Sequence, residues 1–241
     1  PQFTDVTDFH EDLAVVSIGR DKWGFIDKTG KFVVDPSLTD RSVGFFEGHN
    51  DPVSQFRNGL APLANQEGLW GYIDKTGKFA IAPQFSAARM FAEDLAAVAV
   101  TTSGTSRKWG YIDKSGKLVV APRFFNAGDF SEEKAVVSIT GSINMNPDNR
   151  LFGVINKKGE FVIQPVWPSY QLIQNIYSPE EYRGRFAEGL LATSKQTSAR
   201  KANNEGLWGF VDINGKTAIE QKFISVANFK DGIARVVLND G

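Results

Sequence analysis

Residues 69–83 have the sequence LWGYIDKTGKFAIAP, and this stretch decides the fold because it recurs along the chain. The other copies are KWGFIDKTGKFVVDP at 22–36, KWGYIDKSGKLVVAP at 108–122, LFGVINKKGEFVIQP at 151–165 and LWGFVDINGKTAIEQ at 207–221. The aromatic-glycine steps begin at Trp23, Trp70, Trp109, Phe152 and Trp208. The segments between copies vary in length while the copied stretch does not, which predicts a repeat protein whose units stabilise each other.

The alternation of side chains inside this stretch predicts a two-stranded antiparallel hairpin. Side chains in Trp70–Asp74 fall on two faces with the period of two that a strand imposes. Asp74–Gly77 has the composition of a type I turn with a G1 bulge, in which Asp bonds back to the backbone and Gly accepts a left-handed conformation. The chain then returns as a second strand over 78–82. We expect Pro83 to end that strand, because proline offers no N–H to the ladder.

A third strand is predicted upstream of each hairpin, where a run rich in Ala and Val follows a Phe and a turn residue. These runs lie at 13–17, 60–64, 95–100, 135–139, 190–193 and 233–238. A short link with the pattern Pro-x-Phe-x-x-Ala-x-x-Phe joins consecutive units at 83–91 and 122–130. The link at 221–229 has Gln for Pro and Val for Ala, and the opening residues 1–9 match the pattern with Val6 in place of Ala. The sequence therefore starts at a unit boundary and stops inside a sixth unit. Gly241 is then either a truncation point or the end of a strand that completes a ring or caps the array.

Composition limits the classes of function. The 241 residues are 41% hydrophobic and 23% charged, which suits a chain that buries a sizeable core. The 27 basic and 28 acidic side chains are scattered singly, an arrangement that argues against a nucleic-acid partner. The absence of Cys excludes disulfides, thiolate catalysis and Cys-ligated zinc. No stretch approaches the ~20 consecutive apolar residues of a membrane span.

Chemistry-bearing residues inside the repeat have structural explanations. The repeated Trp side chains could form stacking platforms for sugars or peptides, but their presence in nearly every unit favours packing between units. The repeated acids at Asp27, Asp74, Asp113 and Asp212 are expected to form turns rather than to act as acids or metal ligands. No cofactor is expected, since no Gly-rich phosphate loop precedes a helix and the His-Asn-Asp segment at 49–51 lacks the spacing of a metal site.

The five copies, the Pro-x-Phe link and the Leu-Ala-Val runs resemble the WG repeat family, the Lys-Trp-Gly arrays of bacterial proteins. The stretch KWGYIDKSGKLVVAPRF at 108–124 is a specific match, whereas Phe152, Asn156 and Gln221 depart from the pattern. The resemblance implies an all-β repeat domain without enzymatic activity, usually part of a larger surface-exposed or envelope-associated protein, so an extracytoplasmic location is favoured over a cytoplasmic one.

The expected fold class is a tandem array of antiparallel hairpin or three-stranded repeats, either propeller-like or an open superhelix. Three or four strands in about 40 residues match the blade of a propeller, and the same units stacked with a small twist would give the superhelix. We expect one WG-repeat domain over 1–241. Its units lie at about 1–35, 36–82, 83–121, 122–164 and 165–220, followed by a partial unit at 221–241.

Two insertions interrupt the repeat, and repeat arrays vary on their binding side. The first, at 38–56, carries Phe45, Phe46 and His49. The second, at 166–186, carries Trp167, Tyr170, Tyr177, Tyr182, Arg183 and Arg185. Tyr, Trp and Arg are favoured at interface hot spots, which makes the second insertion the stronger candidate. The alternative for both is an ordinary loop folded over the edge of the array.

These observations lead to a non-enzymatic scaffold that binds a protein partner through the second insertion, with the bacterial envelope as one setting. A carbohydrate or cell-wall ligand held by Trp167, Tyr170 and Tyr177 is the alternative. A hydrolase in the channel of a propeller is a third hypothesis, but it rests on fold analogy alone, because paired carboxylates and His clusters are missing outside the repeat.

Overall fold

The computed structural model describes residues 2–19, 22–35, 55–101, 107–140, 150–168, 184–195 and 207–238. Within these ranges every regular element is a β-strand, and every pairing between strands is antiparallel. The described residues include no helix that is long and apolar enough to cross a membrane. Contacts divide the chain into two compact units, the first at Pro1–Pro122 and the second at Arg123–Gly241. The expectation of one domain over 1–241 stays a prediction.

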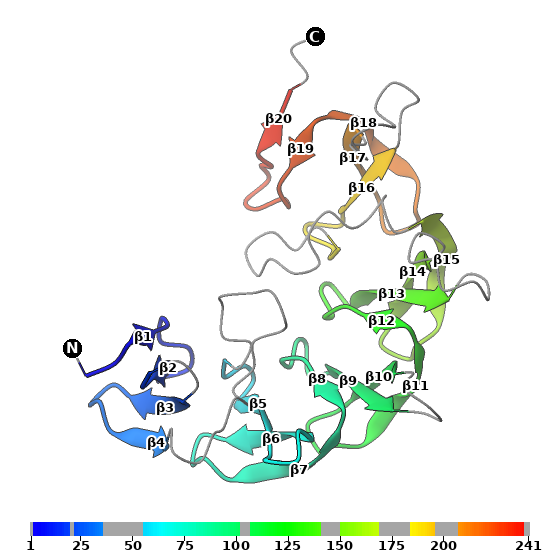
Figure 1. Cartoon of the computed structure of the whole chain (residues 1–241). Helices are drawn as coiled ribbons and strands as arrows, with labels where there is room; N and C mark the ends of the chain where they lie inside the picture. Colours follow the sequence, from blue (N-terminus) through cyan, green and yellow to red (C-terminus); the bar gives the residue numbers. More distant parts are fainter. Residues whose placement is uncertain are drawn as a thin grey trace. The chain divides into compact units, whose positions relative to one another are not determined.

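Each repeat of the first unit forms a small sheet, called a blade below (Figure 1). Blade 1 has the order β1-β2-β3-β4, with β1 at Asp5–Val6, β2 at Leu13–Ser17, β3 at Trp23–Asp27 and β4 at Phe32–Val34. Blade 2 has β5 at Leu60–Ala64, β6 at Trp70–Asp74 and β7 at Phe79–Phe85. Blade 3 has β8 at Ala87–Ala88, β9 at Ala96–Thr101, β10 at Arg107–Ile112 and β11 at Leu118–Phe124, which crosses the boundary of the unit.

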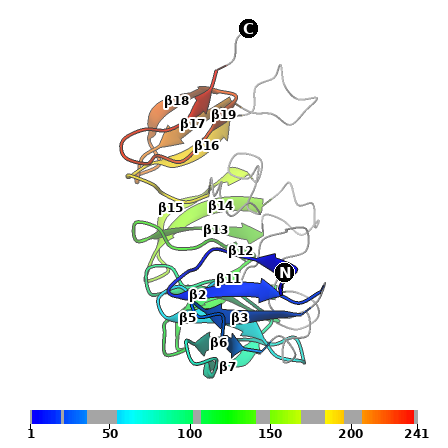
Figure 2. The ribbon, with the colours of Figure 1, turned by 90° about the vertical axis from the view of Figure 1, so that its left-hand side faces the viewer.

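The second unit repeats this arrangement. Blade 4 has β12 at Asn126–Ala127, β13 at Lys134–Thr140, β14 at Arg150–Asn156 and β15 at Phe161–Pro168. Blade 5 has β16 at Leu191–Lys195, β17 at Leu207–Val211 and β18 at Thr217–Phe223, which lie side by side in Figure 2. Blade 6 has β19 at Ser225–Val226 and β20 at Val236–Val237. The predicted hairpin and third strand are thus present, and part of the link adds a short fourth strand, as β8 does in blade 3.

The hairpin turn has the predicted geometry. In blade 2 the N–H of Gly77 donates to the carbonyl of Asp74 at 2.9 Å, and the N–H of Asp74 donates to the carbonyl of Lys78 at 2.8 Å. Gly77 has a φ of 81°, the left-handed conformation that a G1 bulge requires. The prediction of a type I turn with a G1 bulge is confirmed.

The glycine of the Trp-Gly step lies opposite a β-bulge in the returning strand, which is separate from the G1 bulge of the turn. Trp70 pairs with Phe85 and Tyr72 pairs with Ile81, so two steps along β6 span four steps along β7. A Cβ on Gly71 would lie 2.4 Å from the carbonyl oxygen of Ile81, far inside van der Waals contact. The corresponding distances are 2.4 Å at Gly110, 2.7 Å at Gly153 and 2.4 Å at Gly209. Only glycine allows the backbones this close to each other.

The prediction that Pro83 ends the second strand is wrong. β7 continues through Pro83 to Phe85, and β15 likewise continues through Pro165. The bulge explains this difference, because a bulge takes residues out of the regular ladder, and a proline located there removes no ladder hydrogen bond.

A second tight turn precedes β2 and its equivalents. The N–H groups of His10 and Leu13 donate to each other's carbonyls at 2.8 and 3.1 Å, and the two residues between them, Glu11 and Asp12, have φ values of 51° and 75°. Positive φ at both central residues defines a type I′ turn, the connection that matches the twist of a hairpin. The same conformation recurs in every blade, with Asn58-Gly59 in blade 2.

The core lies between consecutive blades. In the first unit, Leu13 and Val15 of blade 1 pack with Ala61 and Ile73 of blade 2 in one cluster. In blades 1, 2 and 5 the second aromatic of the hairpin meets a later Phe edge to face: Phe25 with Phe56 at 5.2 Å, Tyr72 with Phe91 at 4.8 Å, and, in the second unit, Phe210 with Phe229 at 5.0 Å. Such pairs stabilise by about 0.5–1.5 kcal/mol beyond the burial of their area. Within each compact unit, consecutive blades therefore share a core.

Replacing Gly209 with Ala is expected to destabilise the second unit by about 1–3 kcal/mol, the usual effect of forcing extra volume into a packed interior. Its Cβ would lie 2.4 Å from the carbonyl oxygen of Ile219. The matched control is Gly184→Ala in the same unit, since no neighbouring heavy atom lies within 4 Å of that Cβ. Urea unfolding followed by tryptophan fluorescence measures both variants, and equal unfolding midpoints would contradict this role of the glycine.

Candidate interaction surface

Each blade has two chemically different ends. In blade 1, Leu13 pairs with Asp27 at one end of the β2–β3 pair, and Ser17 pairs with Trp23 at the other. The type I′ turn and the Asp-to-Gly turn therefore lie at the same end, which is called the turn end below. The connection between the two strands lies at the opposite end, which is called the variable end.

The Asp-to-Gly turns are closed by their own side chains. Asp27 Oδ1 accepts the N–H groups of Thr29 at 2.9 Å and Lys31 at 3.1 Å, and the hydroxyl of Thr29 at 2.6 Å. Asp74 and Asp113 accept the same set of bonds. The hydroxyl donors, with the N–H groups, hold the pKa of all three carboxyls below the ordinary value of Asp. The prediction that these residues form turns is confirmed.

Blade 4 keeps this turn with an amide in place of the acid. Asn156 Oδ1 accepts the N–H groups of Lys158 and Glu160, both at 3.0 Å. Asp212 in blade 5 makes the corresponding bonds at 2.8 and 2.9 Å. An oxygen acceptor is therefore what the turn requires, whether or not it is charged.

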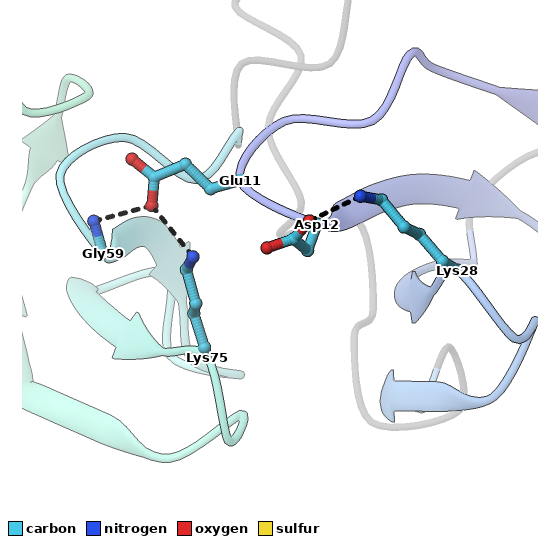
Figure 3. Close-up of polar contacts among 5 residues, drawn as sticks. All are labelled: Glu11, Asp12, Lys28, Gly59 and Lys75. Carbon is cyan, nitrogen blue, oxygen red and sulfur yellow. Dashed lines mark hydrogen bonds and ion pairs between the residues drawn. The ribbon is translucent and has the colours of Figure 1, made fainter.

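The type I′ turns connect neighbouring blades. Glu11 Oε2 accepts the N–H of Gly59 at 2.9 Å and lies 3.4 Å from Lys75 Nζ, so blade 1 reaches both turns of blade 2 (Figure 3). In the second unit, Glu132 accepts the N–H of Gly189 at 2.7 Å, and Glu188 accepts that of Gly232 at 3.0 Å. In each case the Glu at the first central position of one type I′ turn accepts the N–H of the residue at the second central position of the next type I′ turn.

Lysines of the Asp-to-Gly turns face the acids of the type I′ turns. Lys28 lies 2.6 Å from Asp12 (Figure 3), and Lys114 lies 2.7 Å from Asp94. The side chains of both pairs are mostly exposed, so each pair contributes little to stability. These contacts nevertheless join two lysines and two acids of the turn end in pairs.

The repeated indoles are buried. Trp23, Trp109 and Trp208 expose 5%, 8% and 1% of their surface, and Trp70 packs against a core cluster while remaining half-buried. Stacking on a ligand needs an open ring face, which the three buried indoles do not offer. The prediction that the repeated indoles pack between repeats is confirmed.

A shallow hollow of about 280 Å³ lies at the turn end of blade 4. It is lined by Glu133, Lys134, Asn156, Lys157, Lys158 and Val162. This lining contains no Ser, Thr or His that could act as a nucleophile or its base, so its chemistry is that of a mixed-charge surface. Among the described residues, no three side chains of His, Cys, Asp or Glu gather in a group that could hold a metal ion.

Comparison with known families decides what kind of repeat this is. One family model, described as a WG containing repeat, matches residues 1–22, 23–48, 70–100, 109–141, 152–171 and 208–241, more than half of the chain. The chain belongs to the WG containing repeat family. The resemblance based on the Trp-Gly stretches is thereby confirmed. No curated protein matches the sequence of this WG repeat chain.

Two solved structures resemble the WG repeat chain in fold. The computationally designed Ika8 protein is 14% identical, with a TM-score of 0.53 over 98% of this chain and 69% of that one. The β-propeller domain of the Trilobed protease from Pyrococcus furiosus, described as having an open velcro topology, is 11% identical, with a TM-score of 0.51 over 99% of this chain and 80% of that one. Identities this low concern the fold alone, and the predicted fold class, an all-β array of antiparallel repeats in a propeller-like or open superhelical arrangement, is confirmed.

The variable end is where the WG repeats differ in length. In blade 2 the strands are joined by a tight turn, in which Asn65 Oδ1 accepts the N–H groups of Glu67 and Leu69 at 3.0 and 2.9 Å. The corresponding connections at 141–149 and 196–206 are longer. β15 also ends here, because Trp167 pairs with Phe152 near the start of β14. The segment at 169–183 therefore begins at the variable end.

Trp167 belongs to the WG repeat and not to the insertion. It takes the place of Phe85 and Phe223, which pair with the aromatic of the Trp-Gly step in the same way, and it packs half-buried against the core of blade 4. Phe56 and Phe186 are also repeat positions, each at most 2% exposed. The insertions are therefore shorter than 38–56 and 166–186, and the sequence assignment of Trp167 to an insertion is corrected.

The remaining candidate residues divide into two groups. Arg185 is described and exposed, one residue before the buried Phe186. The following candidates lie outside the described residues: Phe45, Phe46, His49, Tyr170, Tyr177, Tyr182 and Arg183. Their contact with a partner stays a prediction.

Sequence reasoning missed the type I′ turns and the contacts between them in neighbouring WG repeats. The turns themselves had a signal in Asn58-Gly59 and Asp231-Gly232, because Asn-Gly and Asp-Gly before a strand are strong indications of a type I′ turn. The bond from Glu11 to Gly59 had no such signal, since it joins residues 48 positions apart.

Replacing Asp74 with Asn is expected to keep the turn and to change how stability depends on pH. The hydroxyl of Thr76 is the main cause that lowers the pKa of Asp74, so the carboxylate stabilises the fold at pH above its ordinary pKa, and this contribution is lost as pH falls through the folded pKa. The difference in melting temperature between parent and variant should therefore shrink from about pH 7 to about pH 3. A difference that stays constant over this range would contradict the role of the charge.

Replacing Glu11 with Ala is expected to lower stability by about 1 kcal/mol, the typical contribution of a hydrogen bond, and to speed amide exchange at Gly59. Glu11→Gln retains an acceptor for Gly59 and should recover most of the loss. Glu67→Ala is the matched control in the same unit, because Glu67 is exposed and uses only its backbone N–H in the turn. If Gly59 exchanged at the same rate in Glu11→Ala and Glu67→Ala, the proposed connection between blades would be wrong.

Proposed function

We propose that this chain is a non-enzymatic scaffold that binds a protein partner through the segments at the variable end, centred on the insertion that follows Trp167. The observation that carries the proposal is the division between the two ends of each blade. The turn end repeats the same bonds from blade to blade, while the variable end holds the connections that differ.

The contacts at the turn end support this choice of surface. Asp side chains there are occupied by the turn, and Glu11, Glu132 and Glu188 accept N–H groups of neighbouring blades. A partner that bound these groups would have to compete with bonds that hold blades together. Functional residues concentrate on loops that a rigid scaffold positions.

The composition of the second insertion favours a protein partner. Its segment at 169–185 contains three Tyr and two Arg, residue types enriched at the centre of protein interfaces. The carbohydrate alternative needs Trp167 as an open platform, yet this side chain is half-buried against a core cluster. The hollow of blade 4 gives no support for enzymatic activity, because no Ser, Thr or His lies in its lining. The bacterial envelope remains the setting implied by the family resemblance.

Replacing residues 169–183 with a short Gly-Ser linker is expected to abolish capture of the partner, because the proposed contact residues would be removed. The measurement is affinity capture from a lysate of the source organism, followed by mass spectrometry and by recombinant binding of the captured protein. The matched control replaces residues 141–149, another long connection at the variable end, and should leave capture intact. Both variants must unfold as the parent does. Unchanged capture by the 169–183 variant would refute the proposal.

A further inference from the structure

Blade 4 differs from the other blades at its turn end. The hollow there is formed by residues at and just before the start of β13, by the turn that follows β14 and by Val162 of β15, all within the second unit. Its volume of about 280 Å³ lies below the roughly 300–1,000 Å³ of pockets that hold drug-sized ligands, so it suits a small chemical group. Blades 1, 2, 3 and 5 have the same repeat positions, so the lining can be compared with them residue by residue.

A lysine of the hollow occupies a position that is apolar in the other blades. The bridge of Lys134 with Ser131 corresponds to the bridges of Leu13, Leu60, Leu95, Leu190 and Ile233. Lys134 is half-buried, and its Nζ donates to the carbonyl oxygen of Glu132 at 3.1 Å and lies 5.8 Å from the ring centre of Phe186. Both of these partners are uncharged at the contact, so they position the ammonium group without neutralising it.

The turn of blade 4 changes in the same electrostatic direction. Asn156 stands where the other turns have an aspartate, and it closes the turn without a negative charge. Lys158 stands where Thr29, Thr76 and Ser115 donate a hydroxyl to that aspartate. The backbone N–H of Lys158 still donates to Asn156 Oδ1 at 3.0 Å, and its exposed side chain lines the hollow.

The lining of the hollow therefore has an excess of positive charge. Its charged residues are three lysines and one acid: Lys134, Lys157, Lys158 and Glu133. In blade 1 the positions of these four residues and of Asn156 hold Leu13, Lys28, Thr29, Asp12 and Asp27. Blade 1 thus has one lysine and two aspartates where blade 4 has three lysines and one glutamate, and blade 3 has the same charges as blade 1.

The acid of the hollow is matched in position by one of the three lysines. Glu133 is the second central residue of its type I′ turn, as Asp12 is in blade 1. Asp12 lies 2.6 Å from Lys28 (Figure 3), and Lys157 stands at the position of Lys28. Two ammonium groups of the hollow are therefore left in excess over its one carboxylate.

A second acid of this turn lies outside the lining. Glu160 stands where the other turns have a lysine, but it does not line the hollow. Its Oε2 accepts the side-chain N–H of Asn156 at 2.9 Å, so this carboxylate is engaged by the turn itself. The ammonium groups of Lys134 and Lys158 remain the distinctive charges of the hollow.

We propose that the hollow at the turn end of blade 4 binds a phosphate group, held by the ammonium groups of Lys134 and Lys158. Each ammonium offers N–H donors to phosphate oxygens, and hydrogen bonds between charged groups are about twice as strong as neutral ones. A phosphate ester carries about −1.5 to −2 charges at neutral pH, which matches the two lysines in excess. This site lies at the opposite end of the blade from the segments of the proposed function, and it goes beyond that function.

Binding at this site leaves the bonds between blades intact. Glu132 accepts the N–H of Gly189 through its carboxylate, whereas Lys134 contacts only its backbone carbonyl. Asn156 closes its turn through backbone N–H groups. A phosphate group that contacts the two lysine side chains therefore competes with none of these bonds.

The test uses the whole chain, labelled with ¹⁵N, and two probes: inorganic phosphate and O-phosphoserine. In low-salt buffer, where exposed charges are least screened, saturable chemical-shift changes are expected at the amides of Lys134, Lys157 and Lys158. Sodium chloride at the same ionic strength should not produce them. Tighter binding of O-phosphoserine would assign the site to the phosphate group of a larger ligand, and tighter binding of inorganic phosphate would assign it to the free ion.

Two substitutions give blade 4 the residues of the other blades and should therefore keep the fold, which urea unfolding checks. Lys134→Leu introduces the residue found at Leu13, and Lys158→Thr introduces the residue found at Thr29. Each is expected to weaken binding by about five- to tenfold, because one charge-assisted contact is lost. Lys216→Leu is the matched control, since it removes an exposed lysine from the turn of blade 5 in the same unit and should bind as the parent does.

Three results would overturn the proposal. Neither probe binds, chloride produces the same chemical-shift changes, or Lys216→Leu weakens binding as much as Lys134→Leu and Lys158→Thr do. Saturable changes centred on residues outside the hollow would overturn it as well. If Lys134→Leu alters the unfolding midpoint, the comparison of Lys158→Thr with Lys216→Leu decides.

Discussion

The close approach between the glycine of the Trp-Gly step and the backbone of the returning strand is the constraint on which the repeat depends. With 2.4 Å between an imagined Cβ on Gly71 and the carbonyl of Ile81, no other residue fits. The approach goes together with the bulge in β7, and the bulge returns Phe85 to a position opposite Trp70. The aromatic pair, the tolerated proline and the link to the next blade all follow from this local geometry.

Much of the fold followed from local chemistry in the sequence. The turn at Asp74–Gly77 could be predicted because its hydrogen bonds join residues at most four positions apart. Pro83 was misjudged, because the bulge that accommodates it depends on a close contact with Gly71, across the hairpin. Trp167 was misplaced because an indole occupies a position where other units have Phe. Contacts such as Glu11 with Gly59 depend on how blades stack, which no single unit encodes.

The two ends of the blades have different roles: bonds that stabilise the fold recur at the turn end, and connections of different length lie at the variable end. At the turn end, Asp27 and Asn156 close their own turns, whereas Glu132 bonds to the turn of the next blade, so that a change at Glu132 affects two blades. At the variable end, connections range from the tight turn at Asn65 to segments of about ten residues. A surface that can vary while the opposite end holds the blades together is the arrangement that repeat scaffolds use to present binding residues.

The edge-to-face contact between Phe25 and Phe56 has a consequence for how such chains evolve. These rings meet at 5.2 Å although the first insertion separates them in sequence. Closing a flexible loop costs only about 0.6 kcal/mol more for each doubling of its length, which is no larger than the gain from one buried aromatic pair. An insertion can therefore lengthen over generations without disturbing the blade that follows it, and new recognition surfaces become accessible by mutation at little thermodynamic expense.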